Sequence, residues 1–184
     1  MSAPKLTGLA HHYVSATIKG GGFVIDATMG RGHDTLFLAR AVGARGQVIG
    51  FDIQSEAIAA TRNRLADAAL LPQVELLQRC HSEIAAVLAE RELKGCDAAM
   101  FNLGYLPRGD HRVCTETKTT LLALQAAHRA LSDGGILAVL CYPGHHRGNE
   151  EFEAVSAWME STPGTERRFQ NEDDENSPVL FLKR

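Results

Sequence analysis

The stretch VIDATMGRGHDT, residues 24–35, decides the fold, because an apolar run passes through a glycine pair into a helical pattern. Short apolar runs of this kind are typical of buried strands, and they recur along the chain. We predict strands at Phe23–Ala27, Gln47–Ile53, Val74–Cys80, Asp97–Asn102, Ile136–Tyr142 and Pro178–Lys183. We predict helices at His33–Val42, Ser55–Leu71, His81–Leu93, Thr119–Ser132 and Glu150–Met159. This alternation predicts an α/β fold: a doubly wound parallel sheet with helices on both faces and a ligand at the carboxyl ends of its strands.

Length and composition indicate one ordinary globular unit. The chain has 184 residues, a formal net charge of −3 and 45% hydrophobic residues. We therefore expect a single domain over residues 1–184, with residues 1–20 as a helical lead-in. No apolar run approaches the roughly 20 residues that span a bilayer, and the four cysteines show no metal-ligand spacing or disulfide framework. These features predict a soluble cytoplasmic protein with no metal site and no membrane contact.

The glycine pair and the acids around it indicate an adenosyl ligand. Gly30 and Gly32 let the backbone approach a ligand closely, and Asp52 follows Gly32 by twenty residues, at the end of the next strand. That spacing suits a carboxylate that accepts the two ribose hydroxyls, in NAD or in S-adenosylmethionine. A dinucleotide fingerprint would have a third glycine where Thr35 stands, and Asp26 suits a cationic amine or sulfonium better than a pyrophosphate. The pattern therefore favours S-adenosylmethionine.

Two further positions belong to this ligand hypothesis. We expect Ser55 to cap the helix that follows Asp52, which leaves that carboxylate for the ligand. At the end of the third strand, His81 is placed to hydrogen-bond or stack on the adenine ring, although a histidine at such a junction is as often an ordinary cap or a solvated residue.

The fourth strand ends in FNLGYLP, residues 101–107, which resembles the Asn-Pro-Pro-Tyr loop of amino-directed methyltransferases. A nitrogen that attacks a methyl group needs acceptors for its protons, so that its lone pair is held in line with the breaking bond. Asn102 Oδ1 and a carbonyl at Leu103 or Gly104 fit that task, and Tyr105 is placed to wall the pocket. An aliphatic amine must also lose a proton, and the sequence does not choose among the candidate bases Asp110, His111, His145 and His146.

These stretches together resemble a bacterial family of small class I methyltransferases long labelled rRNA methylases. Characterised members methylate the amine of 5-aminomethyl-2-thiouridine at the tRNA wobble position. The matching runs are residues 26–36, 51–54, 101–107 with 109–110, 142–145 with Gly148 and 150–151, and 176–178. The departures are Thr28 at the first glycine position, and His146, Arg147 and Asn149 where proline and glycine are expected.

The resemblance implies a Rossmann-like, mostly parallel sheet of seven strands with helices on both faces and an antiparallel last strand. The predicted S-adenosylmethionine-binding residues are Asp26, Thr28, Met29, Gly30, Gly32, Asp34, Thr35, Asp52, Ile53, Gln54, Cys80, His81, Asn102 and Gly104. The predicted catalytic residues are Asn102, Asp110 and His145. The predicted substrate-binding residues are Tyr105, Arg108, His111, Arg112, Tyr142, His145, His146 and Arg147.

An RNA substrate needs positive charge, which this mildly acidic chain offers on loops after its strands. The basic residues there include Arg31 and Lys118 besides the predicted substrate contacts, whereas acids gather in residues 150–153 and 172–175. Tyr105 or Tyr142 could stack on the bases of a single-stranded anticodon loop. The plainer interpretation is that these basic residues form a solvated rim around the pocket and bind nothing.

The main hypothesis is thus a methyltransferase that acts on a tRNA anticodon loop. A homodimer is a possible form of the protein. The alternatives are an rRNA, protein-amide or small-amine acceptor, or a non-catalytic adenosyl-binding subunit.

Overall fold

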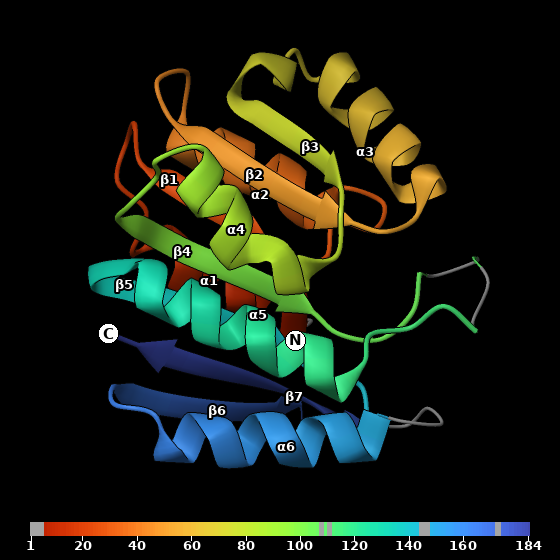
Figure 1. The fold of residues 1–184 in the computed structure, drawn as a ribbon, viewed down its shortest axis with the longest axis vertical. Helices are drawn as coiled ribbons and strands as arrows, with labels where there is room; N and C mark the ends of the chain where they lie inside the picture. The colour runs from red at the N-terminus through yellow and green to blue at the C-terminus, as the bar shows by residue number, and fades with distance from the viewer. Residues whose placement is uncertain (1–5, 107–108, 110–111, 144–147, 172–173) are drawn as a thin grey trace, which may run out of the picture.

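The protein is described by a computed structural model that covers residues 6–106, 109, 112–143, 148–171 and 174–184. In these ranges one seven-stranded sheet has the order β3-β2-β1-β4-β5-β7-β6 (Figure 1). The strands are β1 (Phe23–Asp26), β2 (Gln47–Asp52), β3 (Val74–Gln78), β4 (Cys96–Asn102), β5 (Leu131–Leu140), β6 (Thr165–Asn171) and β7 (Asp174–Lys183). The strands from β3 to β5 pair in parallel, and β7 runs antiparallel to both β5 and β6. The expected parallel sheet with an antiparallel last strand is confirmed.

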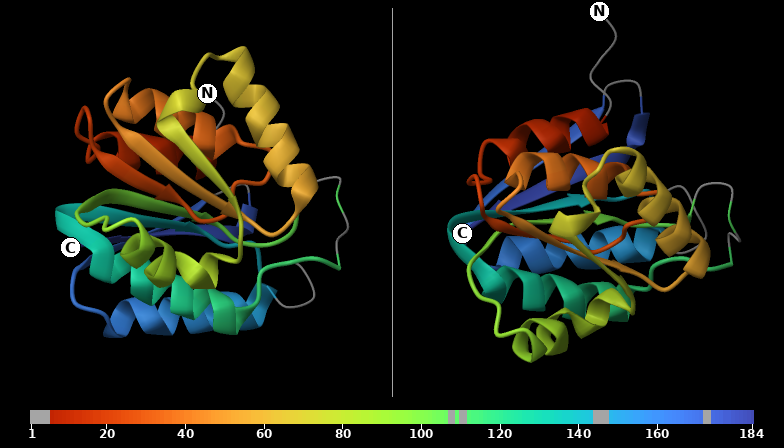
Figure 2. Two further views of the ribbon diagram at one scale, coloured as in Figure 1. Left: turned by 45° about the horizontal axis from the view of Figure 1, so that its top comes forward. Right: turned by 90° about the horizontal axis from the view of Figure 1, so that it is seen from above.

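Helices cover both faces of the sheet (Figure 2). They are α1 (Leu6–Ser15), α2 (His33–Val42), α3 (Ser55–Asp67), α4 (Ile84–Glu90), α5 (Thr117–Ala130) and α6 (Gly148–Ser161), with 3-10 turns η1 (Leu71–Gln73) and η2 (His81–Glu83). The helices α1, α2 and α3 pack on one face, and α4, α5 and α6 pack on the other. Within the described residues no helix is both long enough and apolar enough to cross a bilayer.

The short, continuously apolar strands explain this double coverage. Successive side chains of a strand point to opposite faces. In β1, Val24 is buried among residues of α1 and α2, whereas Ile25 is buried among residues of α4 and α5. A strand that is buried on both faces has an unbroken apolar sequence, and residues 23–27 have a nearly continuous apolar sequence of this kind.

Several predicted boundaries differ from the structure for local reasons. The helix predicted over Ser55–Leu71 ends at Asp67, and Ala69 then takes a left-handed conformation with φ 56°. Pro72 disfavours helical geometry in the residue before it, so the chain resumes as the 3-10 turn η1. The helix predicted over His81–Leu93 divides into η2 and the shorter α4, and α5 ends two residues before the expected Ser132.

Strand β6 was not among the strands predicted from the sequence. Its sequence, TERRFQN, lacks the apolar run by which the other strands were recognised. Because β6 is the edge strand and pairs only with β7, it has no need of two apolar faces, and charged residues are typical of such edges.

The strand order places the reversal of the sheet between β1 and β4. A ligand of a doubly wound sheet binds outside the carboxyl ends of the strands at this reversal. The loops that follow β1, β2, β3 and β4 all lie at that edge, and so does the glycine loop quoted above.

Candidate functional site

A cavity of about 1170 Å³ opens at this edge of the sheet in the described part of the chain. Its walls are the segments that follow five strands: residues 27–31 after β1, 51–54 at the end of β2, 79–81 after β3, 102–106 after β4 and Tyr142 after β5. The volume exceeds that of a typical small-molecule site, so it has room for a nucleoside-sized ligand and a second group beside it.

The glycine loop after β1 is fixed against α3 by close packing and by two hydrogen bonds. Gly30 and Gly32 have φ values of 52° and 76°, in the left-handed region that favours glycine. A Cβ on Gly32 would lie 2.8 Å from Thr61 Cα, so the glycine lets the loop pack directly on α3. Thr61 Oγ1 donates to the Gly30 carbonyl over 3.2 Å, and Arg64 Nε donates to the Arg31 carbonyl over 2.8 Å. The loop is therefore held in place before any ligand arrives.

Asp52 joins this loop to the end of β2. Its Oδ2 accepts the N–H of Gly30 and its Oδ1 accepts the N–H of Gln54, each over 2.9 Å. Burial raises the pKa of the Asp52 carboxyl, and the backbone hydrogen bonds act in the opposite direction. A carboxylate offers about four lone pairs, so two remain available to hydroxyl groups of a ligand. The predicted cap is wrong: Gln54 occupies the N-cap position, and Ser55 is the first residue of α3.

Asp26 does not line the cavity but lies beneath the loop. Its Oδ2 accepts the hydroxyl of Thr35 over 2.6 Å, and its Oδ1 accepts the N–H of Thr28 over 3.2 Å. Burial, and then the nearby charge of Asp34, raises the pKa of the Asp26 carboxyl to about 7. The geometry thus gives Asp26 and Thr35 a role in shaping the loop, and neither residue lines the cavity.

The end of the cavity that follows β2 and β3 contains an exposed apolar side chain, Ile53, and a ring nitrogen without a hydrogen-bond partner, His81 Nε2. Ile53 is 52% exposed and lines the cavity, so it offers an apolar surface to a flat ring. His81 is buried, and its Nε2 has no hydrogen-bond partner among the described residues. Burial lowers the pKa of His81 to about 4, opposed by a hydrogen bond to the backbone of Ala27, so the ring is neutral and Nε2 can only accept. An unpartnered acceptor of this kind fits a ligand with an amino group.

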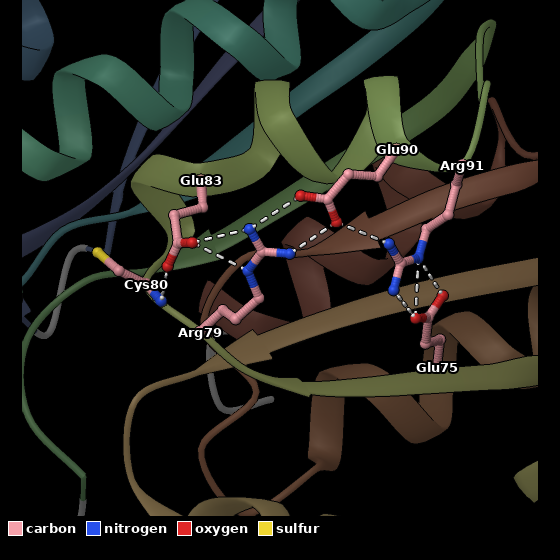
Figure 3. Close-up of polar contacts among 6 residues, drawn as sticks. All are labelled: Glu75, Arg79, Cys80, Glu83, Glu90 and Arg91. Atoms are coloured by element: carbon pink, nitrogen blue, oxygen red, sulfur yellow. Dashed lines mark hydrogen bonds and ion pairs between the residues drawn. The ribbon is translucent and has the colours of Figure 1, made fainter.

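A network of ion pairs lies next to this end of the cavity, and its member Arg79 also lines the cavity (Figure 3). Arg79 pairs with Glu83 over 2.8 Å and with Glu90 over 2.9 Å, and Arg91 continues the chain by pairing with Glu90 over 3.0 Å. Glu83 also accepts the N–H of Cys80 over 3.2 Å. Exposed pairs add little stability on their own, so the effect of the network is to hold the Cys80–His81 turn against the cavity.

Asn102 lies at the end of β4, where its amide is oriented by neighbours on both sides. Its backbone N–H donates to Thr28 Oγ1 over 2.7 Å, and its Nδ2 donates to Asp34 Oδ2 over 3.3 Å. The other oxygen of Asp34 accepts from His11 Nε2 over 2.7 Å, and the His11 ring stacks on Phe37. The amide thus turns its Nδ2 toward the Asp34 carboxyl. Oδ1, which has no donor among the described residues, is left for a ligand.

The loop after Asn102 is fixed at its base by a buried carboxylate. Gly104 and Thr115 exchange two hydrogen bonds of 2.9 Å, one from the Gly104 N–H to Thr115 Oγ1 and one from the Thr115 N–H to the Gly104 carbonyl. Glu151 on α6 accepts the hydroxyls of Thr115 and Thr120 over 2.7 and 2.6 Å. Glu151 is only 2% exposed, so this member of the acidic run 150–153 is a buried structural residue. The Gly104 carbonyl already accepts one hydrogen bond, whereas no hydrogen bond among the described residues uses the Leu103 carbonyl.

Most of the predicted cofactor-binding residues come together in the cavity. Those that line it are Thr28, Met29, Gly30, Asp34, Asp52, Ile53, Gln54, Cys80, His81, Asn102 and Gly104. Asp26, Gly32 and Thr35 do not line it. Of the predicted substrate contacts, Tyr105 and Tyr142 line the cavity and are 41% and 36% exposed, whereas Arg112 lies outside the lining. Arg108, Asp110, His111, His145, His146 and Arg147 lie outside the described residues.

Sequence reasoning missed residues that act through distant contacts. His11 reaches Asp34 across 23 positions, and Thr61 and Arg64 reach the glycine loop across 31 and 33. No local pattern marks these three residues, because they lie on ordinary helices. Among the residues that the structure describes, no group of three or more histidine, cysteine, aspartate or glutamate side chains could hold a metal ion.

Comparisons with known proteins agree with this geometry. Residues 48–181 match the model of the family described as "Putative rRNA methylase". The tRNA (mnm(5)s(2)U34)-methyltransferase of Arabidopsis thaliana chloroplasts is 37% identical over 189 residues, which cover 97% of this chain and 68% of that protein. The ribosomal RNA small subunit methyltransferase H of Geobacter sp. (strain M21) is 39% identical over 87 residues, which cover 47% of this chain and 27% of that protein.

Two solved structures resemble the whole chain. An rRNA methylase structure from Clostridium thermocellum has a TM-score of 0.91 and 36% identity, with all of both chains covered. A methyltransferase from Streptococcus mutans, solved in complex with SAH, has a TM-score of 0.84 and 28% identity over 98% of both chains. The sequence resemblance and the predicted fold are both confirmed, and the chain belongs to the rRNA methylase family of Rossmann-like methyltransferases.

Proposed function

We propose that this protein transfers a methyl group from S-adenosylmethionine to the exocyclic amine of 5-aminomethyl-2-thiouridine at the wobble position of tRNA. The family membership and the whole-chain likeness to a structure with bound SAH support S-adenosylmethionine as the methyl donor. The observation that carries the choice of acceptor is the fixed amide of Asn102, whose Oδ1 is left open toward the cavity.

The residues present fit the donor. The half-exposed Ile53 and the unpartnered Nε2 of His81 suit an adenine ring and its amino group. Asp52 suits the ribose hydroxyls, and the open turn at Gly30 gives the ligand room beside the backbone. When bound, S-adenosylmethionine supplies a methyl group that its sulfonium already activates, so transfer leaves S-adenosylhomocysteine and releases one proton from the acceptor amine.

The protein itself contributes by orienting the acceptor amine toward the methyl group. Asn102 Oδ1 and the Leu103 carbonyl are placed to accept the protons of an amine, and this would direct the nitrogen lone pair toward the methyl group. Holding the reactants in this way can supply roughly 7–11 kcal/mol of the barrier. Tyr105 and Tyr142 at the mouth present exposed rings on which bases of a single strand could stack.

The choice of tRNA is supported by the Arabidopsis relative, which matches 97% of this chain. An rRNA acceptor is favoured by the matches to ribosomal RNA small subunit methyltransferase H, but these cover about half of this chain and about a quarter of those proteins. We therefore rank tRNA first.

In vitro methylation tests the proposal directly. Purified protein and labelled S-adenosylmethionine are incubated with tRNA that carries the unmethylated aminomethyl nucleoside, with tRNA that lacks the aminomethyl group, and with ribosomal subunits. The proposal predicts label only in the first sample, at the mass of the monomethylated amine. Label only in the ribosomal subunits would contradict it and favour the rRNA acceptor.

A further inference from the structure

A second cavity, of about 530 Å³, lies between α1 and α2 and shares three lining residues, His33, Asp34 and Asn102, with the first one. It is lined by Thr7, His11, His33, Asp34, Leu36, Phe37, Arg40 and Asn102. The helices α1 and α2 lie side by side on the same face of the sheet (Figure 2), joined by the His11–Asp34 bond. Nothing in the sequence analysis assigned a role to Thr7, His11, Phe37 or Arg40.

We infer that this second cavity receives the acceptor nucleotide, whose amine then reaches Asn102 from the side of α1. The inference rests on the proposed function and adds the route by which the substrate arrives. The ligand class is a nucleotide with an amine on its base and a phosphate beside it.

The strand order supplies the first argument. The adenosine side of the main cavity follows β2 and β3, whereas Asn102 follows β4, and α1 lies beyond it over β5 and β7. A nitrogen that attacks a methyl group must approach from the side opposite the leaving sulfur. An acceptor that enters beside α1 would face the adenosine side across Asn102, and this arrangement is compatible with such an approach.

The charges in the second cavity supply the next argument. Asp34, a buried acid, lies at its inner end, where its two oxygens accept from His11 and Asn102, and a carboxyl oxygen keeps a lone pair that can accept an N–H of an amine. Arg40 lies at the outer part, is exposed, and makes no hydrogen bond or ion pair with the described residues. A free guanidinium at the opening suits a phosphate. An aminomethyl nucleotide within an RNA strand carries an amine on its base and a phosphate on its backbone. The amine would lie at the inner end of the second cavity and the phosphate at its opening.

The size and the lining of the second cavity suit a nucleotide. The volume falls within the range of ordinary small-molecule sites. The stacked rings of His11 and Phe37, 3.8 Å apart and 5° from parallel, form part of its lining. They give a rigid, flat wall suited to a planar base.

Two variants test the route with the full-length protein. Thr7→Trp places a large ring in the cavity, and Arg40→Ala removes the cation at its opening. The matched controls are Gly8→Trp, at an exposed α1 position with nothing within 4 Å of an added Cβ, and Arg62→Ala, an exposed arginine of α3. For each, the dissociation constants of precursor tRNA and of S-adenosylmethionine are measured in binding assays, together with KM and kcat.

We expect Thr7→Trp to weaken tRNA binding about tenfold, the size of one lost specific contact. Arg40→Ala should lower the slope of log K against log salt concentration by about 0.7, as one lost phosphate contact to a single strand does. The S-adenosylmethionine dissociation constant and both controls should stay within about twofold of the wild type. Unchanged tRNA binding in Thr7→Trp and Arg40→Ala would overturn the inference, and so would a selective loss of S-adenosylmethionine binding, which would assign the cavity to the donor.

The design separates this inference from the proposed function. Arg40 is exposed, so its variant tests the cavity even where Thr7→Trp fails to fold. If the wild-type protein methylates another RNA instead, the proposed acceptor is wrong, and the same variants still test the cavity with that RNA.

Discussion

The amide Nδ2 of Asn102 donates to Asp34 Oδ2 over 3.3 Å, and this one contact sets which end of the amide faces the cavity. Asp34 is itself held by His11 Nε2 over 2.7 Å. An asparagine without such a neighbour can present either its oxygen or its nitrogen to a ligand. Here the oxygen is presented, and an oxygen is the atom that a primary amine needs as its hydrogen-bond acceptor.

The first prediction concerns Asn102→Ala. The change removes an acceptor that orients the amine but leaves Asp52, Ile53 and His81 on the adenosine side intact. We expect kcat for precursor tRNA to fall by about 100-fold, the usual scale for a lost positioning or electrostatic group. Calorimetry should give an S-adenosylmethionine affinity within about twofold of the wild type. The control is Asn63→Ala, at an exposed position of α3. A variant that binds the donor poorly but turns over normally would contradict the role of Asn102.

The second prediction concerns Asp52→Ala. Loss of this carboxylate removes the ribose acceptor and also releases the N–H groups of Gly30 and Gln54. We expect donor binding to weaken by roughly 1–3 kcal/mol, the usual cost of a lost partner for buried polar groups. Calorimetry measures the change, with Asp67→Ala at the exposed end of α3 as the control. Equal affinities in wild type and Asp52→Ala would place the ribose elsewhere.

The third prediction separates backbone strain from close packing in the glycine loop. Gly32 has φ 76° and ψ 21°, in the left-handed region, and an added Cβ would lie 2.8 Å from Thr61 Cα. The left-handed conformation alone costs an alanine about 1–2 kcal/mol of unfolding free energy. Gly32→Ala should cost more than this, because the Cβ must also displace the loop or α3. Denaturant unfolding of the wild type and of Gly32→Ala measures the loss. A loss of no more than about 1–2 kcal/mol would mean that the contact with α3 contributes nothing.

Much of the donor side of the site was predictable from sequence, because its residues follow one another locally. The glycine pair, and Asp52 twenty residues after Gly32, are fixed by the chain's own path from strand to helix. The strand sequences also predicted both buried faces of the sheet, since parallel strands have no polar side. Edge strand β6 was not predicted, because a strand paired on one side need not be apolar. The other edge strand, β3, was predicted as a buried strand, but none of its residues is buried.

The supporting contacts were not predictable, because they join distant parts of the chain. Asp34 was expected to touch the cofactor, and nothing in residues 33–36 indicates that His11 would hold it. Glu151 belongs to an acidic run that is typical of a solvated helix face. Its burial depends on two threonines that lie 31 and 36 positions earlier, and only the packing of α6 on α5 brings them together.

The fourth prediction concerns the pH dependence of stability at His81. Its pKa is lowered from 6.5 to about 4 in the fold, mainly by burial. Between these values the unfolded chain binds a proton that the folded chain does not, so folding loses stability as the pH falls from about 6.5 to about 4. The contribution is fully present above pH 6.5. His81→Gln cannot titrate and should lack this part of the pH dependence.

Denaturant unfolding at several pH values tests this point, with His12→Gln, an exposed histidine of α1, as the control. The stability of the wild type relative to His81→Gln should rise between pH 4 and pH 6.5 and stay level above it. A flat difference over that range would show that the His81 ring takes up its proton in the fold as readily as in the unfolded chain.

The fifth prediction concerns Glu151, the buried carboxylate on which the base of the Asn102 loop depends. Glu151→Ala leaves the hydroxyls of Thr115 and Thr120 without their acceptor, and we expect a loss of about 1–3 kcal/mol in unfolding free energy. Because Thr115 also bonds to Gly104, the loop should lose its fixed position. KM for the RNA should then rise more than the S-adenosylmethionine dissociation constant.

The neighbouring acid Glu150, exposed on the same helix, provides the control, since Glu150→Ala removes an equal charge without touching the loop. Glu151→Gln keeps one acceptor oxygen and should recover part of the stability and of the RNA affinity. If Glu151→Ala lowered stability but left KM for the RNA unchanged, the carboxylate would hold α6 against α5 only. The position of the loop would then have to be set by the backbone bonds between Gly104 and Thr115 alone.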